Sequence, residues 1–156
     1  MDSARSRLMK LLRDADAHDR FRLLYPVNDA RAPIYVHAKI MIVDDRILKL
    51  GSANLNNRSM GYDAGYDVII EALEGGNEAA KTISRHRNGL LAEHLGCDVS
   101  RLEVEMEVTH SLIKTIDALN RTFGRGLVDV PLRELTADEE AIAESDIADP
   151  ERPTGV

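Results

Sequence analysis

The 156-residue chain contains one cysteine, Cys97, and no run of 18 consecutive apolar residues. A single thiol has no partner within the chain, so an internal disulfide framework is excluded, and this favours a reducing compartment. The missing apolar run excludes a membrane-spanning helix, and residues 1–19 lack the apolar segment of a secretory signal. We therefore expect a cytoplasmic protein, with peripheral contact to a membrane as an open alternative.

The chain also has few histidine and cysteine residues that could bind a metal, and its basic residues do not outnumber its acidic ones. Five histidines and one cysteine leave little material for a metal cluster, so no metal and no cofactor are expected. Residues 129–156 contain nine acidic and two basic residues, which accounts for the whole net charge of −7. The neutral body makes nucleic acid an unlikely partner, since such partners require a basic surface. A neutral body remains compatible with a local cationic pocket for one phosphate.

Apolar patterns in the first half predict one helix and then a group of strands. Leucines at helical spacing predict a helix over residues 3–18. A strand is predicted over residues 21–25, where Pro26 stops it, and β-branched residues predict strands over 34–43, 47–50 and 66–72. Residues 44–46 form a tight turn, which joins the strands over residues 34–43 and 47–50 as a hairpin. A polar loop over residues 51–63 precedes the strand over residues 66–72.

The second half is predicted to be helical. One helix begins near Asn77 and ends at Gly96, and another is capped by Ser100 and carries an apolar stripe as far as Phe123. Acidic residues and three prolines over residues 129–156 predict an extended, partly disordered tail. The sequence thus predicts the α/β class, with one domain over residues 1–128 followed by that tail, and it shows no internal repeat.

One short segment carries side chains suited to phosphodiester chemistry. His37 and Lys39 lie two positions apart on a predicted strand, so alternation places both on one face. Asp44 lies in the turn, and Ser52 and Asn54 follow the return strand, which can bring them back beside His37. Lysine and asparagine can donate to phosphate oxygens, a serine can add a hydrogen bond, and a histidine can act as nucleophile or general acid. No metal is required, because the lysine matches the phosphate charge.

The segment reads IYVHAKIMIVDDRILKLGSANLNNRSMG, with the spacing HxKxxxxD followed by GSxN. Six fixed residues at this spacing are specific, and the alternative is an ordinary hairpin with a surface histidine and lysine. The segment resembles the second HKD motif of the phospholipase D superfamily, in particular that of bacterial phospholipase D and cardiolipin-synthase-like proteins. The resemblance runs from residue 5 to the C-terminus and makes the chain similar to the C-terminal half of such an enzyme.

The resemblance implies an α/β/α half with a mixed sheet and an active site at the seam between two similar halves. It implies that one histidine attacks phosphorus to form a phosphohistidine and that the other, which matches His37, acts as acid and base. Lys39 and Asn54 match residues that hold phosphate oxygens, Ser52 supports them, and the motif aspartate is structural or orienting. The candidate catalytic residues are His37, Lys39 and Asp44, and the candidate substrate-binding residues are Ser52, Asn54 and Arg58.

Two departures from the family pattern bear on activity. No second HxK occurs, so a second histidine has to come from another chain or another copy, as in single-motif relatives that form homodimers. Gly65 also stands where the family usually has a glutamate that orients a catalytic histidine. Without that carboxylate the imidazole can be misaligned or in the wrong tautomer. Asp63 and Asp67 are candidates to replace it.

Three functions stay open at this point. The favoured one is a phosphodiesterase half that hydrolyses or transfers phosphatidyl groups of a phospholipid, paired as a homodimer or with a missing N-terminal HKD half. The second is a catalytically inactive, truncated remnant. The third is a single-motif homodimeric nuclease, against which the neutral body and acidic tail argue. Arg58 either binds a headgroup or braces its own loop.

Overall fold

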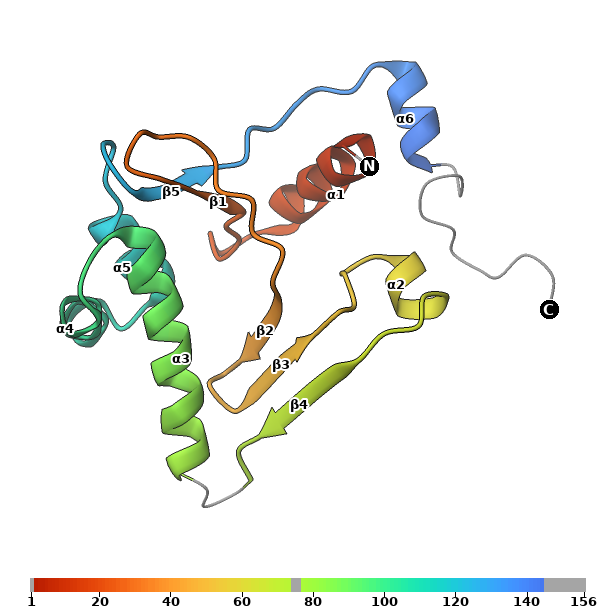
Figure 1. The fold of residues 1–156 in the computed structure, drawn as a ribbon. Coiled ribbons are helices and arrows are strands. Elements are labelled where there is room, and N and C mark those ends of the chain that lie inside the picture. The colour runs from red at the N-terminus through yellow and green to blue at the C-terminus, as the bar shows by residue number, and fades with distance from the viewer. Residues whose placement is uncertain (1, 74–76, 145–156) are drawn as a thin grey trace. The chain divides into compact units, whose positions relative to one another are not determined.

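The computed structural model of the chain describes residues 2–73 and 77–144 (Figure 1). Within these residues the chain forms six helices and two β-sheets, which confirms the predicted α/β class. The end of the predicted tail, from residue 145 onward, lies outside the described residues.

Two compact units make up the chain, and each is described by itself. The hairpin unit consists of residues 24–51 and 68–129, and it contains the β-hairpin of the HKD motif. The loop unit consists of residues 1–23, 52–67 and 130–156, and it contains the polar loop that follows the motif. The boundary between the units therefore divides the candidate site residues into two groups.

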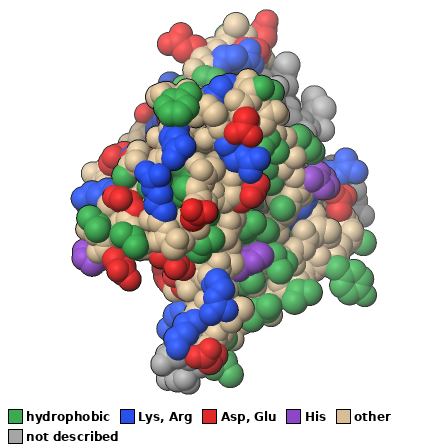
Figure 2. All heavy atoms as spheres, turned by 60° about the vertical axis from the view of Figure 1, so that its left-hand side comes forward, with side chains coloured by type: hydrophobic (Ala, Val, Ile, Leu, Met, Phe, Trp, Pro, Cys, Tyr) green, Lys and Arg blue, Asp and Glu red, His purple; other side chains and the backbone are tan. Residues whose placement is uncertain are grey.

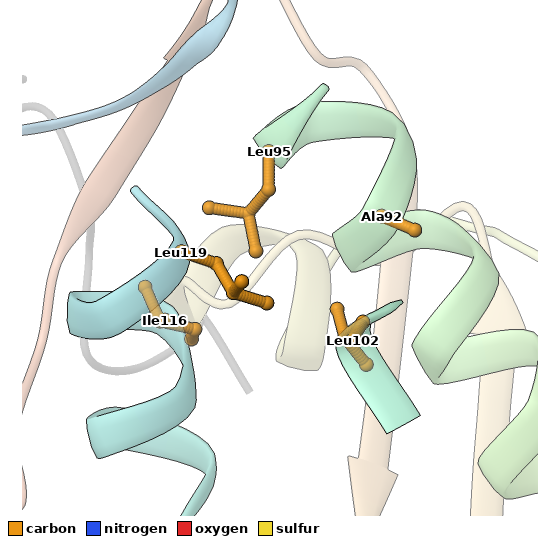
Figure 3. Packing of buried hydrophobic residues seen from close by; sticks show 5 residues of the cluster. All are labelled: Ala92, Leu95, Leu102, Ile116 and Leu119. Carbon is orange, nitrogen blue, oxygen red and sulfur yellow. The ribbon is translucent and has the colours of Figure 1, made fainter. Parts of the chain in front are cut away.

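Three helices build the core of the hairpin unit: α3 (Asn77–Leu95), α4 (Val99–Thr109) and α5 (Leu112–Leu119). Their inward faces share one buried apolar cluster, made of Ala92, Leu95, Leu102, Ile116 and Leu119 (Figure 3). The members recur three residues apart on α3 and on α5, which puts them on one face of each helix. Each fully buried leucine or isoleucine side chain contributes about 1.5–3 kcal/mol, so this cluster fixes the three helices against one another.

The sequence pattern predicts one long helix where the structure has α4 and α5. Its cap was expected at Ser100, whereas the N-cap of α4 is Asp98. His110 adopts a left-handed conformation with φ 50° and ends α4, and the Ser111 hydroxyl then accepts the N–H three residues on to begin α5. Phe123 lies beyond α5 and is 70% exposed, so it does not extend the apolar stripe. Local side-chain hydrogen bonds thus compete successfully with a continuous helix.

The predicted hairpin is confirmed in the hairpin unit. Strands β2 (Lys39–Val43) and β3 (Ile47–Gly51) pair antiparallel, and β4 (Asp67–Glu71) lies on the other side of β3. Strand β2 begins five residues later than the sequence pattern suggests. The later start of β2 follows from the length of its partner strand. Strand β3 ends at Gly51, directly opposite Lys39, so residues before Lys39 have no β3 residue to pair with.

A second, two-stranded sheet is formed by β1 (Leu24–Val27) and β5 (Gly126–Asp129). The strand predicted over residues 21–25 is displaced toward Pro26, which lies inside β1 instead of ending it. The Pro26 carbonyl accepts the Ile34 N–H at 2.8 Å. The N and C=O groups of one strand residue point to the same side, so the missing N–H of the proline faces away from β5 and costs no ladder bond.

The loop unit contains α1 (Asp2–Ala15), α2 (Asn57–Gly61) and α6 (Ala137–Glu144). The predicted N-terminal helix is confirmed as α1, which buries Met9 and contacts α6. Helix α2 lies within the predicted polar loop, where the Asn56 side chain caps it by accepting the Ser59 N–H at 2.8 Å. A short capped helix thus shapes the loop that carries half of the candidate site.

Helix α6 corrects the expectation that the chain is extended after residue 129. The Thr136 N–H donates to the Glu139 carboxylate at 3.0 Å, and the Glu139 N–H donates to the Thr136 hydroxyl at 3.4 Å. This reciprocal arrangement is a capping box, which stabilises a helix start. The Thr136 N–H, followed by the Arg133 side chain, lowers the pKa of Glu139.

Candidate active site

The histidine and lysine of the HKD motif lie where the chain enters the hairpin. His37 is exposed and precedes β2, and Lys39 is the half-buried first residue of that strand. The Lys39 Nζ donates to the backbone carbonyl of His37 at 2.7 Å. Because His37 lies outside the strand, strand alternation does not fix its direction as expected. The ammonium is instead held beside the His37 backbone, with two further N–H groups left to donate.

A tyrosine ring lies beside the His37 imidazole, and the sequence interpretation did not include it. The ring centroids of Tyr35 and His37 are 6.0 Å apart and their planes differ by 28°, which is a stacked arrangement. Tyr35 is 86% exposed, so its ring lies beside the imidazole at the surface and does not fill a core. The sequence held no firm signal for this pair, because both rings precede β2 and strand alternation does not apply to them.

Asp44 is the first of two central residues in the turn that closes the hairpin. The Arg46 N–H donates to the Val43 carbonyl at 2.9 Å, and both Asp44 and Asp45 have positive φ, 51° and 55°. This is the geometry of a type I′ turn, which matches the twist of the paired strands. Aspartate is among the few residues other than glycine that tolerate this backbone region. The backbone geometry therefore gives Asp44 a structural role in the turn, one that asparagine or glycine could also fill.

An ion pair holds this turn to the helical core within the hairpin unit. Arg87 of α3 donates to the Asp45 carboxylate, and the two side chains are 18% and 31% exposed. Arg87 also donates to Asn88 Oδ1 at 3.0 Å. The turn is fixed on its other side by the Ala72 N–H, which donates to the Arg46 carbonyl at 2.8 Å. The segment that carries Asp44 is therefore anchored from two directions.

Register links the two halves of the motif along the chain. Lys39 lies opposite Gly51 in the β2–β3 ladder, and Gly51 is the first residue of the GSxN sequence. The chain then passes directly into Ser52, the first residue of this part of the loop unit. Along the chain, the HxK and GSxN sequences therefore both adjoin the same end of the hairpin.

A cavity in the loop unit is lined by two of the predicted substrate-binding residues. Its volume is ≈ 380 Å³, within the range of small-ligand sites. Ser52 and Asn54 line one part of it, and Ser59, Asp63 and Gly65 are among the other lining residues. Hydroxyl and amide groups thus face an open space large enough for a phosphate group.

The Ser52 hydroxyl is held by the backbone of Tyr66. It accepts the Tyr66 N–H at 2.9 Å and donates to the Tyr66 carbonyl at 3.3 Å, while the Ser52 N–H donates to the same carbonyl at 3.0 Å. A Cβ placed on Gly65 would lie 2.4 Å from the Ser52 Oγ. Glycine at the position of the family glutamate is therefore coupled to the placement of the serine.

The other polar side chains of the loop bond to near neighbours. The Arg58 Nε donates to the Asp63 carboxylate at 3.1 Å, which favours a loop-bracing role for this arginine. The Asn54 Nδ2 donates to the Ser59 hydroxyl at 3.4 Å. The Ala53 N–H donates to the Asp67 carboxylate at 3.4 Å. The two candidate replacements for the family glutamate are thus both engaged within the loop unit.

The structure therefore gathers the candidate residues in two groups. In the hairpin unit it brings Lys39 to His37 and places Asp44 in the turn. In the loop unit it brings Ser52 and Asn54 to one cavity and pairs Arg58 with Asp63, which also lines that cavity. Among residues 2–73 and 77–144, no three histidine, cysteine or acidic side chains gather in a way that would hold a metal ion. Nor does any helix in that range have the length and apolar character to cross a bilayer.

The hairpin carries the HxKxxxxD pattern and leads into GSxN, the two patterns on which the resemblance rests. A family model described as phospholipase D matches residues 7–135. The chain therefore belongs to the phospholipase D family. This match confirms the resemblance to the phospholipase D superfamily.

Individual relatives agree with the family assignment. The chain is 33% identical over 126 residues to phospholipase D1 of Saccharomyces cerevisiae, covering 65% of this chain and 8% of that protein. It is 40% identical over 84 residues to phospholipase D zeta 1 of Arabidopsis thaliana, covering 47% of this chain and 8% of that protein. It is 34% identical over 113 residues to a phospholipase D of Phytophthora infestans, covering 64% of this chain and 6% of that protein.

The chain thus spans less than a tenth of the length of these relatives. No solved structure matches the chain.

Proposed function

We propose that the chain is one half of a phospholipase D-type phosphodiesterase, which hydrolyses or transfers phosphatidyl groups. The observation that carries this proposal is the register of Lys39 against Gly51, because it adjoins the HxK and GSxN sequences at one end of the hairpin. Membership of the phospholipase D family supports the substrate class. The cavity lined by Ser52 and Asn54 supplies space for a phosphate group.

In this proposal each side chain has a separate role. The remaining N–H groups of Lys39 and the amide of Asn54 neutralise and hold the phosphate oxygens. Ser52 supports this arrangement through its hydroxyl, which the Tyr66 backbone orients. Asp44 fixes the turn through its left-handed backbone and does not exchange protons with the substrate. His37 is the acid and base, exposed at the hairpin entrance.

The proposed reaction proceeds in two displacement steps. A histidine nitrogen from a second HKD half attacks phosphorus as the P–O bond to the alcohol breaks, and His37 donates a proton to the leaving alkoxide. A water or a second alcohol then attacks phosphorus, His37 takes its proton, and the N–P bond breaks to release phosphatidate or the new diester. Splitting one difficult displacement into two is the usual advantage of a covalent intermediate.

The second histidine is proposed to come from another HKD half that covers exposed apolar surface on this one. Strand β4 has no buried residue, and Val68, Ile69 and Ile70 are 59%, 65% and 44% exposed. An apolar strand exposed along its whole length marks an interaction surface. The occupant is either a second copy of this chain, related by a two-fold axis, or an HKD half on another chain.

Release of choline from phosphatidylcholine vesicles tests the proposal. Wild-type chain, His37→Asn and the matched control His86→Asn, an exposed histidine on α3, are compared at equal concentration. We expect His37→Asn to lower the rate about 10²–10⁴-fold, the typical contribution of a general acid and base, and the control to leave it unchanged. Light scattering on the same samples reports whether the active species is a dimer.

Two results would contradict the proposal. One is equal activity of the wild type and His37→Asn, which would remove His37 from the chemistry. The other is a stable dimer that releases no headgroup from any phosphatidyl lipid tested. The second result favours the alternative of a catalytically inactive remnant, for which the specific observation is Gly65 in place of the family glutamate.

A further inference from the structure

A second cavity lies in the hairpin unit and involves no residue of the HKD sequence. Its volume is ≈ 490 Å³, and it is bounded by the end of α3, the start of α4 and the loop after α5. Three arginines line it, Arg101, Arg121 and Arg125, together with the only thiol of the chain, Cys97. Figure 2, in which the left-hand side of Figure 1 comes forward, shows basic side chains gathered among acidic ones on this face.

Two of the three guanidinium groups have no hydrogen-bond or ion-pair partner among residues 2–73 and 77–144. Arg125 donates to the Glu93 carboxylate at 2.5 Å, so its charge is largely matched. For the side chains of Arg101 and Arg121 the described part of the chain supplies no hydrogen bond and no ion pair. Both are exposed at the cavity, which is also lined by the carboxylate of Asp98. With Arg125 matched by Glu93, two arginines face one carboxylate, and this excess of positive charge attracts an anion.

Cys97 lines the same cavity as these two arginines. Burial raises the pKa of Cys97, and the positive charges of Arg101 and then Arg121 oppose that rise. The negative charge of Asp98 adds to the rise. The two arginines thus reach one cavity from α4 and from the loop after α5. A ligand held between them would lie over Cys97 and cover it.

The start of α4 contributes further donors to the same cavity. Its N-cap residue, Asp98, makes no side-chain capping bond, so the first N–H groups of this 11-residue helix are not satisfied by the cap. Asp98 and Val99 line the cavity. Uncapped N–H groups at a helix start add to the attraction for an anion, and the negative charge of Asp98 offsets part of it.

We propose that this cavity binds a phosphate monoester, as a site separate from the HKD residues. Two unpaired guanidinium forks match the two charges and the several oxygens of a monoester dianion, and the volume suits a small phosphorylated molecule. The monoester is carried either by a soluble molecule or by the headgroup of phosphatidate in a bilayer. Both sources present the same group to Arg101 and Arg121.

Alkylation of Cys97 by N-ethylmaleimide measures occupancy, because no other thiol reports. The probes are inorganic phosphate, glycerol 3-phosphate, and vesicles of phosphatidylcholine with or without phosphatidate, with sodium chloride at matched ionic strength as the salt control. We expect a phosphate probe to slow alkylation several-fold with saturation, and chloride to have little effect. Loss of one charged hydrogen-bond donor in Arg101→Gln or Arg121→Gln weakens the apparent affinity about tenfold.

The matched control is Arg85→Gln, an exposed arginine on α3 that does not line the cavity, and it retains protection. Protection by glycerol 3-phosphate identifies a soluble ligand, and protection by phosphatidate vesicles alone identifies a headgroup. Broadening of the phosphorus resonance of inorganic phosphate by the wild-type chain checks binding without any variant. The proposal is wrong if no probe protects Cys97, if chloride protects it equally, or if Arg101→Gln and Arg121→Gln are protected like the wild type.

Discussion

The hydroxyl of Ser52 occupies the space into which any side chain at Gly65 would project. A Cβ on Gly65 would lie 2.4 Å from the Ser52 Oγ and 3.7 Å from the Ser52 Cβ, so the conflict involves the hydroxyl alone. The backbone of Gly65 lies outside the left-handed region, so steric space rather than dihedral strain makes glycine necessary here. A glutamate restored at this position would first have to displace the serine that the motif supplies.

This relationship predicts non-additive effects at the two positions. Gly65→Ala turns the Ser52 hydroxyl away from Tyr66 and lowers the free energy of unfolding by about 1 kcal/mol, the net value of a hydrogen bond. In a Ser52→Ala background the same change is neutral or slightly stabilising, because the conflict is gone and alanine restricts the unfolded chain. Urea unfolding of the four proteins measures the coupling. Equal effects of Gly65→Ala in both backgrounds would contradict this account.

The turn at Asp44 predicts a dependence on backbone preference. Asp44→Asn and Asp44→Gly keep a residue that tolerates φ near 51° and leave stability nearly unchanged. Asp44→Ala forces a residue without that tolerance into the left-handed region and costs about 1–2 kcal/mol. Denaturant midpoints of the three variants test this order, and an alanine variant as stable as the asparagine variant would show that the turn does not depend on this residue.

The Arg87–Asp45 pair predicts a measurable coupling between helix α3 and the hairpin. Both side chains are more than two thirds shielded from solvent, so the pair is less screened than a surface ion pair. A double-mutant cycle with Arg87→Gln and Asp45→Asn is expected to give a coupling energy of about 1 kcal/mol, within the range for contacting residues. The exposed pair of Lys81 and Glu78 is the matched comparison and should couple less strongly. Equal coupling of the two pairs would show that the hairpin turn is not anchored through Arg87.

Locally encoded features of the site were predictable, and features that depend on pairing partners were not. The hairpin and its turn follow from β-branched residues on either side of Asp44 and Asp45. The start of β2 does not, because it is set by where β3 ends at Gly51. The contact of Ser52 with Gly65 joins residues 13 positions apart through the hydrogen bonds of Tyr66, which composition does not reveal.

Two other differences had signals in the sequence. Acidic composition obscured the first signal, and apolar periodicity obscured the second. The capping box of Thr136 and Glu139 is a four-residue signature, but it lies in an acidic stretch whose composition favours disorder. The break between α4 and α5 is marked by Thr109 and Ser111, whose hydroxyls bond locally; the Thr109 hydroxyl lies 2.7 Å from that of Thr115. The apolar stripe continues across this break, so periodicity alone predicts one helix.

Asp16 predicts how the loop unit responds to acid. Its carboxylate accepts the N–H groups of Arg20 at 2.9 Å, Phe21 at 2.8 Å and His18 at 3.3 Å, which orders the chain after α1. The N–H of Arg20, followed by that of Phe21, lowers the pKa of Asp16 below its ordinary value of 3.8. A lowered folded pKa means that the stabilisation is fully present above the unfolded pKa and is lost as pH falls through the folded pKa.

The expected result is a difference between wild type and Asp16→Asn that is constant near neutral pH and disappears in acid. Asparagine can still accept a hydrogen bond but carries no charge, so the variant lacks the part of the stability that depends on protonation of this group. Amide chemical shifts of Arg20 and Phe21 in the wild-type chain should titrate together, with a midpoint below 3.8. A midpoint at or above that value would show that the carboxylate gains nothing from the three N–H groups in solution. In that case the loss of stability in acid would have to come from other carboxylates.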